Sequence, residues 1–248
     1  MGLSHDSPYR ASSTTYAMLS RPSSLLNTGD RLGLGGFVQR RIRPLATLKR
    51  SGDIAFSLAM LSLGSPVLIT VALLVKLTSP GPVFFVQKRI GRRFQRFGCI
   101  KFRTMELDAD RRLQELLESC PQLRAEFEKD HKLRRDPRIT PIGQFLRLTS
   151  LDELPQFWNI LCGEMSVVGP RPIVEQEIPR YGPAMEQVLS VRPGLTGLWQ
   201  VSGRNNVSYQ RRVLLDLTYV NRRSLGLDLR ILWRTVSVVL FPANKGAY

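Results

Sequence analysis

The stretch that decides the fold is IAFSLAMLSLGSPVLITVALLV, which runs from Ile54 to Val75 without a formal charge. A helix needs ~20 apolar residues to cross a bilayer, so the length alone suggests one membrane pass. Gly64, Ser65 and Pro66 lie near its middle, however, and proline kinks a helix because it removes a donor and clashes with the preceding turn. The pattern predicts a helix that bends at Ser65-Pro66. A buried helix of a soluble core remains the alternative.

Basic residues flank both ends of this run, with Lys49 and Arg50 before it and Lys76 and Lys88 after it. Positive residues prefer the cytoplasmic side of a membrane. A straight pass would leave one basic end on the wrong side, whereas a helix that enters, bends and returns leaves both in the cytoplasm. The flanks therefore favour a re-entrant helix.

Residues 1–47 lack sustained periodicity and predict a flexible tail, with no secretory signal peptide. The tail ends in a basic cluster, Arg40 to Arg43. This cluster is either a solvated linker or an attachment to anionic lipid, worth ~1 kcal/mol per basic residue.

The chain carries 36 Lys and Arg against 20 Asp and Glu, a formal net charge of +16. Its partner is therefore expected to be negative: nucleic acid, an anionic membrane or a phosphate-bearing substrate. Three cysteines, Cys99, Cys120 and Cys162, are far apart and form no CxxC motif. They indicate neither a disulfide framework nor a zinc site.

Downstream of the apolar run the pattern predicts an α+β fold that is mostly helical. Two short apolar segments, Val83–Gln87 and Phe97–Phe102, are expected to form a β-hairpin. Helical periodicity follows in 105–129 (divided at Pro121), Ile142–Leu148, Gln156–Leu161, Val213–Tyr219 and Leu225–Phe241. The last of these is amphipathic, so it either lies in the membrane interface or packs on the core.

The densest chemical block is RLTSLDELPQ, residues 147–156. Ser150 and Glu153 have capping-box spacing, which would make the acidic pair Asp152-Glu153 a helix cap. Pro155 fits that cap poorly, because it lacks the N–H that a helix starting at Ser150 would require. The alternative is a catalytic carboxylate pair among basic residues.

Two further blocks carry features of phosphate sites. Arg171 lies between two prolines in GPRP, residues 169–172, and a fixed guanidinium suits bidentate phosphate binding. The other reading is a rigid turn. The glycine-rich block RPGLTGLWQVSGRN, residues 192–205, would let backbone N–H groups approach an anion, but it contains neither a Walker A loop nor GxGxxG. Trp199 in this block either stacks on a base or sugar or belongs to the core.

Together these blocks resemble the bacterial sugar transferases of exopolysaccharide and O-antigen synthesis, the monotopic phosphoglycosyl transferases. The resemblance covers about four fifths of the chain, from Lys49 to Tyr248. Its motifs, in the family's order, are the apolar run with Ser65-Pro66, QKRIG (87–91), KFRTM (101–105), TSLDELPQ (149–156), GPRP (169–172), RPGLTG (192–197) and DLTYV (216–220). The chain looks like the short members of the family, which include the succinoglycan-type exopolysaccharide galactosyl-phosphate transferases.

The resemblance implies that the enzyme transfers a hexose-1-phosphate from a UDP-sugar to polyprenol (undecaprenyl) phosphate and releases UMP. Asp152 would be the nucleophile and would carry the phosphosugar, and Glu153 would bind Mg²⁺. The residues expected to bind substrate phosphates are Lys101, Arg103, Arg147, Arg171, Arg192 and Arg204. Those expected in the nucleotide and sugar pocket are Pro170, Pro172, Trp199, Gln200, Asp216 and Tyr219.

The implied organisation is a tail (1–47), a re-entrant helix (48–78) and a catalytic domain (79–248) on the cytoplasmic face of the bacterial inner membrane. The expected partners are the UDP-sugar, the polyprenol phosphate, anionic lipid and other polysaccharide-assembly enzymes, but no nucleic acid. Two alternatives remain open: a basic nucleic-acid-binding protein and a non-catalytic membrane scaffold of polysaccharide assembly. The sequence does not distinguish galactose from glucose.

Overall fold

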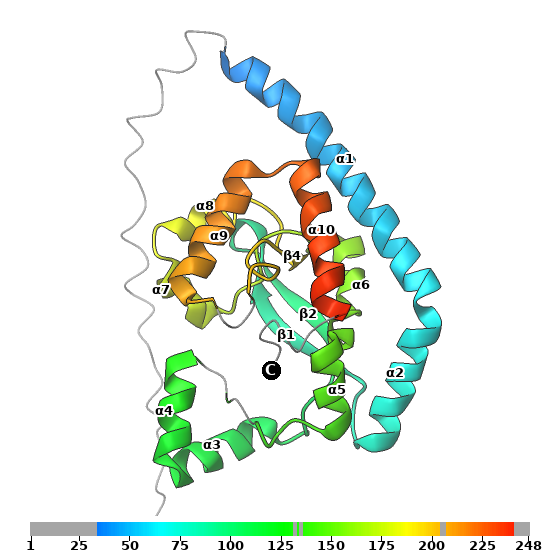
Figure 1. The fold of residues 1–248 in the computed structure, drawn as a ribbon, viewed down its shortest axis with the longest axis vertical. Helices are drawn as coiled ribbons and strands as arrows, with labels where there is room; N and C mark the ends of the chain where they lie inside the picture. The colour runs from blue at the N-terminus through cyan, green and yellow to red at the C-terminus, as the bar shows by residue number, and fades with distance from the viewer. Residues whose placement is uncertain (1–33, 131–132, 134–135, 204–206, 241–248) are drawn as a thin grey trace, which may run out of the picture. The chain divides into compact units, whose positions relative to one another are not determined.

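A computed structural model describes residues 34–130, 133, 136–203 and 207–240 (Figure 1). The chain divides after Thr47, and the account below concerns the unit that begins at Leu48. That unit is mostly helical with a small amount of sheet, as the sequence predicts. Most of the expected tail lies outside the described residues, but helix α1 (Leu34–Leu63) already begins within it. A formed helix extends at little cost, which accounts for a start ahead of the apolar run.

The apolar run forms two helices, the end of α1 and the whole of α2 (Ser65–Thr78), which are bent by 61°. Pro66 lies in the first turn of α2, where its missing N–H costs nothing. Gly64 lies at the bend, and a Cβ there would collide with the carbonyl oxygen of Met60. The predicted bend is therefore confirmed. Among the described helices no single one is long and apolar enough to cross a membrane, whereas this bent pair satisfies both requirements together.

Two small sheets form the β part. The predicted hairpin is confirmed: β1 (Phe84–Ile90) pairs antiparallel with β2 (Arg96–Phe102). A parallel pair, β3 (Ser166–Val168) with β4 (Gly194–Thr196), was not expected. A Cβ on Gly194 would collide with the backbone of Gly169, so this glycine of the 192–205 block serves close strand packing.

The helices after the hairpin mostly match the predicted segments. Those in the first half are α3 (Ala109–Ser119), α4 (Pro121–Asp130), α5 (Pro141–Thr149) and α6 (Gln156–Cys162). Two short helices, α7 (Ile178–Tyr181) and α8 (Ala184–Val188), were not predicted, and α9 (Tyr209–Arg222) and α10 (Leu225–Leu240) follow. The described residues also include the 3₁₀ turns η3 (Arg92–Phe94), η4 (Leu151–Glu153) and η5 (Glu175–Glu177).

The main core lies between the hairpin and the helices α6, α9 and α10. Its fully buried members include Ile160 of α6, Tyr219 of α9 and Ile231 of α10. The outer face of α10 nevertheless exposes 67% of Leu229 and 80% of Trp233. One face of α10 thus packs on the core, while the other presents large apolar side chains outward.

A buried polar network fastens the start of the apolar run to this core. Asp53 accepts hydrogen bonds from the Ser166 hydroxyl (2.7 Å) and the Val167 amide (3.2 Å). Lys49 pairs with Asp228 of α10 at 2.7 Å, and the hydroxyl of Tyr219 donates to the same carboxylate at 2.8 Å. Buried charges require such partners, so the α1 helix is fixed to β3 and α10.

Candidate active site

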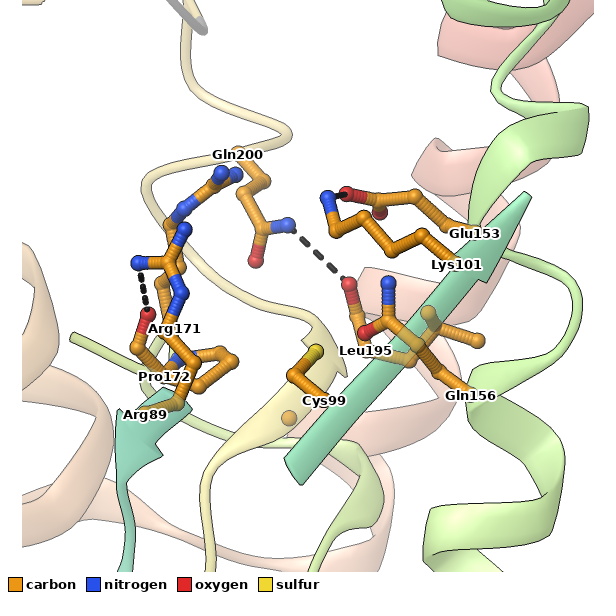
Figure 2. Close-up of a pocket in the computed structure, with 10 residues that line it drawn as sticks. Arg89, Cys99, Lys101, Glu153, Gln156, Arg171, Pro172, Leu195 and Gln200 are labelled. Carbon is orange, nitrogen blue, oxygen red and sulfur yellow. Dashed lines mark hydrogen bonds and ion pairs between the residues drawn. The ribbon is translucent and has the colours of Figure 1, made fainter. Parts of the chain in front are cut away.

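A pocket lies between β2, η4 and the segments around Arg171 and Gln200. Figure 2 shows Lys101 and Glu153 on one side and the guanidinium groups of Arg89 and Arg171 on the other. The complete lining is Arg89, Cys99, Lys101, Glu153, Gln156, Arg171, Pro172, Gly194, Leu195 and Gln200. Three cations against one carboxylate make it a site for an anion.

The acidic pair is positioned by a tight turn. Helix α5 ends at Thr149, and the left-handed backbone of the next residue, Ser150 (φ 61°), turns the chain into the 3₁₀ helix η4. Ser150 makes no side-chain cap to η4, and α6 begins only at Gln156, after Pro155. The capping-box interpretation of Ser150 is therefore wrong. The acidic residues lie in a strained connection between two helices, and such strain concentrates at functional sites.

Asp152 is buried, with 7% of its surface exposed, beside the pocket but not among its lining residues. Burial, and then repulsion from Glu153, raise the pKa of Asp152 to about 6, against the lowering effect of Lys101 and Arg147. A carboxylate with a raised pKa is more basic and still mostly ionised at neutral pH. These are the properties of a nucleophile that works at neutral pH.

The pKa of Glu153 is shifted in the opposite direction from that of Asp152. Its Oε1 accepts a 2.6 Å ion pair from Nζ of Lys101, which β2 carries across from 52 residues earlier in the chain. Burial opposes its ionisation, but the charges of Lys101 and Arg171 prevail and lower the pKa of Glu153 well below its usual range. Neighbouring carboxylates with pKa values pushed apart are a pattern of sites that assign them different roles.

The opposite wall of the pocket holds two guanidinium groups. Arg89 donates to the carbonyl oxygen of Pro172 at 3.0 Å, and burial, then the charge of Arg171, lower its pKa to about 10. Arg171 lies over the ring of Trp199 at 5.8 Å, and Arg212 lies 4.7 Å from the same ring. Trp199 is itself buried, so in this structure it serves as a platform that orients Arg171.

Two glutamines of the pocket have unsatisfied polar atoms. Nε2 of Gln200 donates to the carbonyl oxygen of Leu195 at 3.0 Å, which leaves its buried Oε1 without a partner among the described residues. Nε2 of Gln156 is likewise buried and unpartnered there. Unpaired buried polar atoms are costly, and a polar substrate in the pocket would satisfy them. Arg89, Gln156 and Cys99 were not predicted as site residues, although Arg89 lies within the QKRIG motif.

Several residues expected to bind phosphate lie elsewhere. Arg103 is buried and donates to the carbonyl oxygens of Ser79 (2.7 Å) and Pro80 (2.6 Å), so it closes the end of α2. Arg147 donates from Nε to the Thr104 hydroxyl at 2.9 Å and acts on Asp152 through its charge.

Arg192 lines a second cavity rather than this pocket. Arg204 lies outside the described residues.

Two residues expected in the nucleotide and sugar pocket are core residues in the structure. Asp216 is fully buried and accepts a 2.9 Å hydrogen bond from Tyr181, and burial raises its pKa to about 7. The hydroxyl of Tyr219 is occupied by Asp228, as described above. Pro170 is buried next to the pocket residue Arg171. Asp216 and Tyr219 thus support the fold behind the pocket.

Residues 45–242 match the profile of the family described as bacterial sugar transferase. The chain belongs to this family. The match spans the bent helix pair, the pocket and the second cavity, so the family resemblance seen in the motifs is confirmed.

Three relatives indicate the range of the family. The chain is 51% identical to an uncharacterized sugar transferase of Haemophilus influenzae and 49% identical to the undecaprenyl-phosphate galactose phosphotransferase of Salmonella typhimurium. Each alignment covers 81% of this chain but 42% of the relative, so the chain spans about four tenths of the length of these relatives. It is also 48% identical to the exopolysaccharide production protein ExoY of Sinorhizobium fredii, covering 84% of this chain and 91% of that protein.

Proposed function

We propose that this protein is a phosphoglycosyl transferase that moves a hexose-1-phosphate from a UDP-hexose to polyprenol phosphate. The observation that carries the proposal is the pair of neighbouring carboxylates beside a pocket lined by cations. The pKa of Asp152 is raised, whereas Glu153 is kept ionised by Lys101. Membership of the sugar transferase family supports it, as does the similarity to the undecaprenyl-phosphate galactose phosphotransferase of Salmonella typhimurium.

In the first step a carboxylate oxygen of Asp152 attacks the phosphorus that bears the sugar. The new O–P bond forms as the bond between this phosphorus and the bridging diphosphate oxygen breaks, and UMP leaves with the bonding electrons. Lys101, Arg89 and Arg171 line the pocket where the negative oxygens would lie, and fixed cations stabilise charge that develops there.

In the second step the phosphate oxygen of the polyprenol phosphate attacks the same phosphorus. The bond to Asp152 breaks, the carboxylate is regenerated, and the product is a polyprenyl-diphosphate sugar. No net proton is needed in either step, since a carboxylate and a phosphate are the two nucleophiles.

We also propose that Mg²⁺ assists, with Glu153 as its protein ligand. Within the described part of the chain there is no cluster of three or more metal-binding side chains. Mg²⁺ does not need one, because it commonly binds through one or two carboxylates plus substrate phosphates, and the acidic pair provides such carboxylates. When bound, the ion would neutralise diphosphate charge. Glu153 would have to exchange its ion pair with Lys101 for the metal, and this would free the lysine for a phosphate.

The sugar is proposed to be galactose, because a relative with 49% identity is named for galactose. The test of the function is to incubate the purified protein with Mg²⁺ and UDP-galactose, UDP-glucose or UDP-N-acetylglucosamine in turn. A covalent hexose-phosphate adduct on Asp152, found by mass spectrometry, identifies the sugar and the nucleophile together. Failure of all donors to release UMP would contradict the proposal.

The activity should depend on pH through Asp152. Its pKa is raised to about 6, and only the ionised carboxylate attacks. We therefore expect kcat/KM for UMP release to fall about tenfold per pH unit below pH 6 and to be level from 7 to 8. Glu153, with its lowered pKa, stays ionised over this range. A profile that is flat between pH 5 and 7 would exclude Asp152 as the titrating nucleophile.

We further propose that the bent helix pair enters the cytoplasmic face of the bacterial inner membrane and returns to it. The exposed fractions of Leu63 and Leu77 are 83% and 81%, and Ile69 and Leu73 are also exposed. Apolar side chains exposed to this extent favour a lipid environment. The outward face of α10, with Trp233, would lie in the interface, where tryptophan is enriched.

Cysteine labelling checks this topology. In a variant without native cysteines, Ala46→Cys and Pro82→Cys should both react with a membrane-impermeant maleimide only after the cells are opened. Leu63→Cys, at the bend, should react only after detergent is added. Labelling of positions 46 and 82 from opposite sides would mean a true span. Pro66→Ala should shift the segment towards spanning, because it removes the proline kink.

A further inference from the structure

A second cavity of about 400 Å³ lies between the tip of the hairpin and the end of α6. Its lining includes four arginines, Arg92, Arg93, Arg96 and Arg192, and we name it the arginine cavity. Glu164 is the one carboxylate in the lining, and it already accepts a 2.7 Å hydrogen bond from Asn159. The arginine cavity therefore carries a large excess of positive charge.

The guanidinium groups are anchored so that some of their donors remain free. Nε of Arg92 donates to the carbonyl oxygen of Ser190 at 3.1 Å, and Nε of Arg192 donates to that of Gly163 at 2.7 Å. Among the described residues neither arginine has an acceptor for its two terminal nitrogens. Two fixed guanidinium groups with free terminal N–H donors form the fork that binds phosphate.

The cations in and beside this cavity are also poorly compensated. Arg50 lies nearby, where it donates to the last carbonyls of α6 at Ile160 (2.6 Å) and Leu161 (3.0 Å). Burial, then the charges of Arg50 and Arg92, lower the pKa of Arg192. In the described part of the chain, only Arg96 of the cavity forms an ion pair, with exposed Glu175. An anion would relieve this repulsion.

The hairpin tip adds an independent observation. Arg93 and Phe94 both have left-handed backbones, with φ of 56° and 61°, although neither is glycine. The turn is held by the Arg93 amide, which donates to Leu189 at 2.8 Å, and by the Gly91 amide, which donates to Gln95 at 2.8 Å. Consecutive left-handed non-glycine residues are unfavourable and are retained mainly where a function uses them. Here the turn holds Arg92 and Arg93 at the edge of the cavity.

We propose that the arginine cavity binds a phosphate group, separately from the pocket of Lys101 and Glu153. The phosphate belongs either to a phospholipid headgroup or to a soluble phosphate compound. Arg50 lies four residues before the apolar run that starts at Ile54, which is compatible with a lipid at this level. The proposal does not rest on the transferase reaction and would hold if that reaction were assigned wrongly.

Cys162 provides a native reporter, because it is exposed and lines the arginine cavity. The full chain is placed in phosphatidylcholine nanodiscs, and alkylation of Cys162 by iodoacetamide is followed by mass spectrometry. Inorganic phosphate should slow this alkylation severalfold, while Cys120, which is remote in α3–α4, should not change. Sodium chloride at equal ionic strength controls for screening.

Variants connect any protection to the arginines. Arg92→Gln and, separately, Arg192→Gln should each raise the phosphate concentration needed for protection about tenfold, since each removes a guanidinium group whose terminal nitrogens have no acceptor among the described residues. The matched control, Arg111→Gln on α3, removes an exposed arginine from another part of the surface and should change nothing. The two arginines are replaced in separate proteins, so that a folding defect in one variant does not decide the result.

A second arm separates the sources. Nanodiscs with phosphatidylglycerol and no added phosphate should protect Cys162 if the ligand is a headgroup, and phosphatidylcholine discs with inorganic phosphate should protect it if the ligand is soluble. Either result supports the arginine cavity as a phosphate site. Unchanged alkylation in both arms, or protection that survives both variants, would overturn it.

Discussion

Replacing Asp152 with asparagine is expected to reduce UMP release by at least about 10⁴-fold and to abolish the covalent adduct. An amide is not a nucleophile towards phosphorus, and loss of a covalent nucleophile typically costs this much or more. The measurement is UMP release from the UDP-hexose, with intact mass spectrometry of the protein in the same samples. The control is Asp110→Asn, which changes an exposed carboxylate on α3 by the same single group.

The asparagine variant should fold at least as well as the native protein. The pKa of Asp152 is raised above its value in an unfolded chain, so its ionised form is disfavoured in the folded state at neutral pH. A neutral side chain of the same shape removes that cost, and the thermal unfolding midpoint should be unchanged or higher. Loss of activity therefore could not be attributed to unfolding. Retained UMP release would instead contradict the assignment of Asp152 as the nucleophile.

Replacing Lys101 with methionine is expected to lower kcat/KM about a hundredfold and to move its acidic limb to higher pH. The lysine is the partner of Glu153 at 2.6 Å, and its charge lowers the pKa of both carboxylates. Without it Asp152 should titrate above about 6, and the pocket loses one of its three cations, which is typically worth 10²–10³ in rate. The measurement is kcat/KM for UMP release between pH 5.5 and 9.

Two variants make the result specific. Lys88→Met removes an exposed lysine from β1 of the same hairpin and should leave the profile unchanged. Lys101→Arg retains the positive charge, so it should restore the position of the acidic limb while recovering only part of the rate. A profile that keeps its midpoint in Lys101→Met would mean that the ion pair does not set the pKa of Asp152.

The sequence was sufficient wherever a feature is local. The bend was predicted from Gly64 and Pro66, and the hairpin from two apolar segments about ten residues apart. The β3–β4 pair was not predicted, because each strand has three residues and its partner lies about thirty residues away. So short a segment has no detectable periodicity. Its glycines suggested anion binding, whereas the structure uses Gly194 for a close backbone approach.

The sequence predicted which chemical groups the candidate site contains, but not which of its side chains contact one another. The acidic pair and Lys101 were chosen as motif residues, but their ion pair spans 52 positions and no spacing rule predicts it. Arg103 and Arg192 were predicted from their motifs to bind substrate phosphate, but neither lines the pocket in the structure. A basic residue in a motif suggests phosphate, yet a guanidinium can equally bind backbone carbonyls, and Arg103 does so at the end of α2. Motif membership does not reveal which acceptor an arginine meets.

Buried contacts join the bent helix pair to the rest of the unit, and they determine where the chain can be truncated. Val75 of α2 is fully buried against Phe102, and Asp53 and Lys49 supply partners to β3 and α10. A version trimmed to start after residue 78 would keep Asp228 and the Ser166 hydroxyl but lose the groups that satisfy them. The bent helix pair and the part of the unit that carries the pocket therefore form one cooperative body, and a chain cut between them should not fold stably.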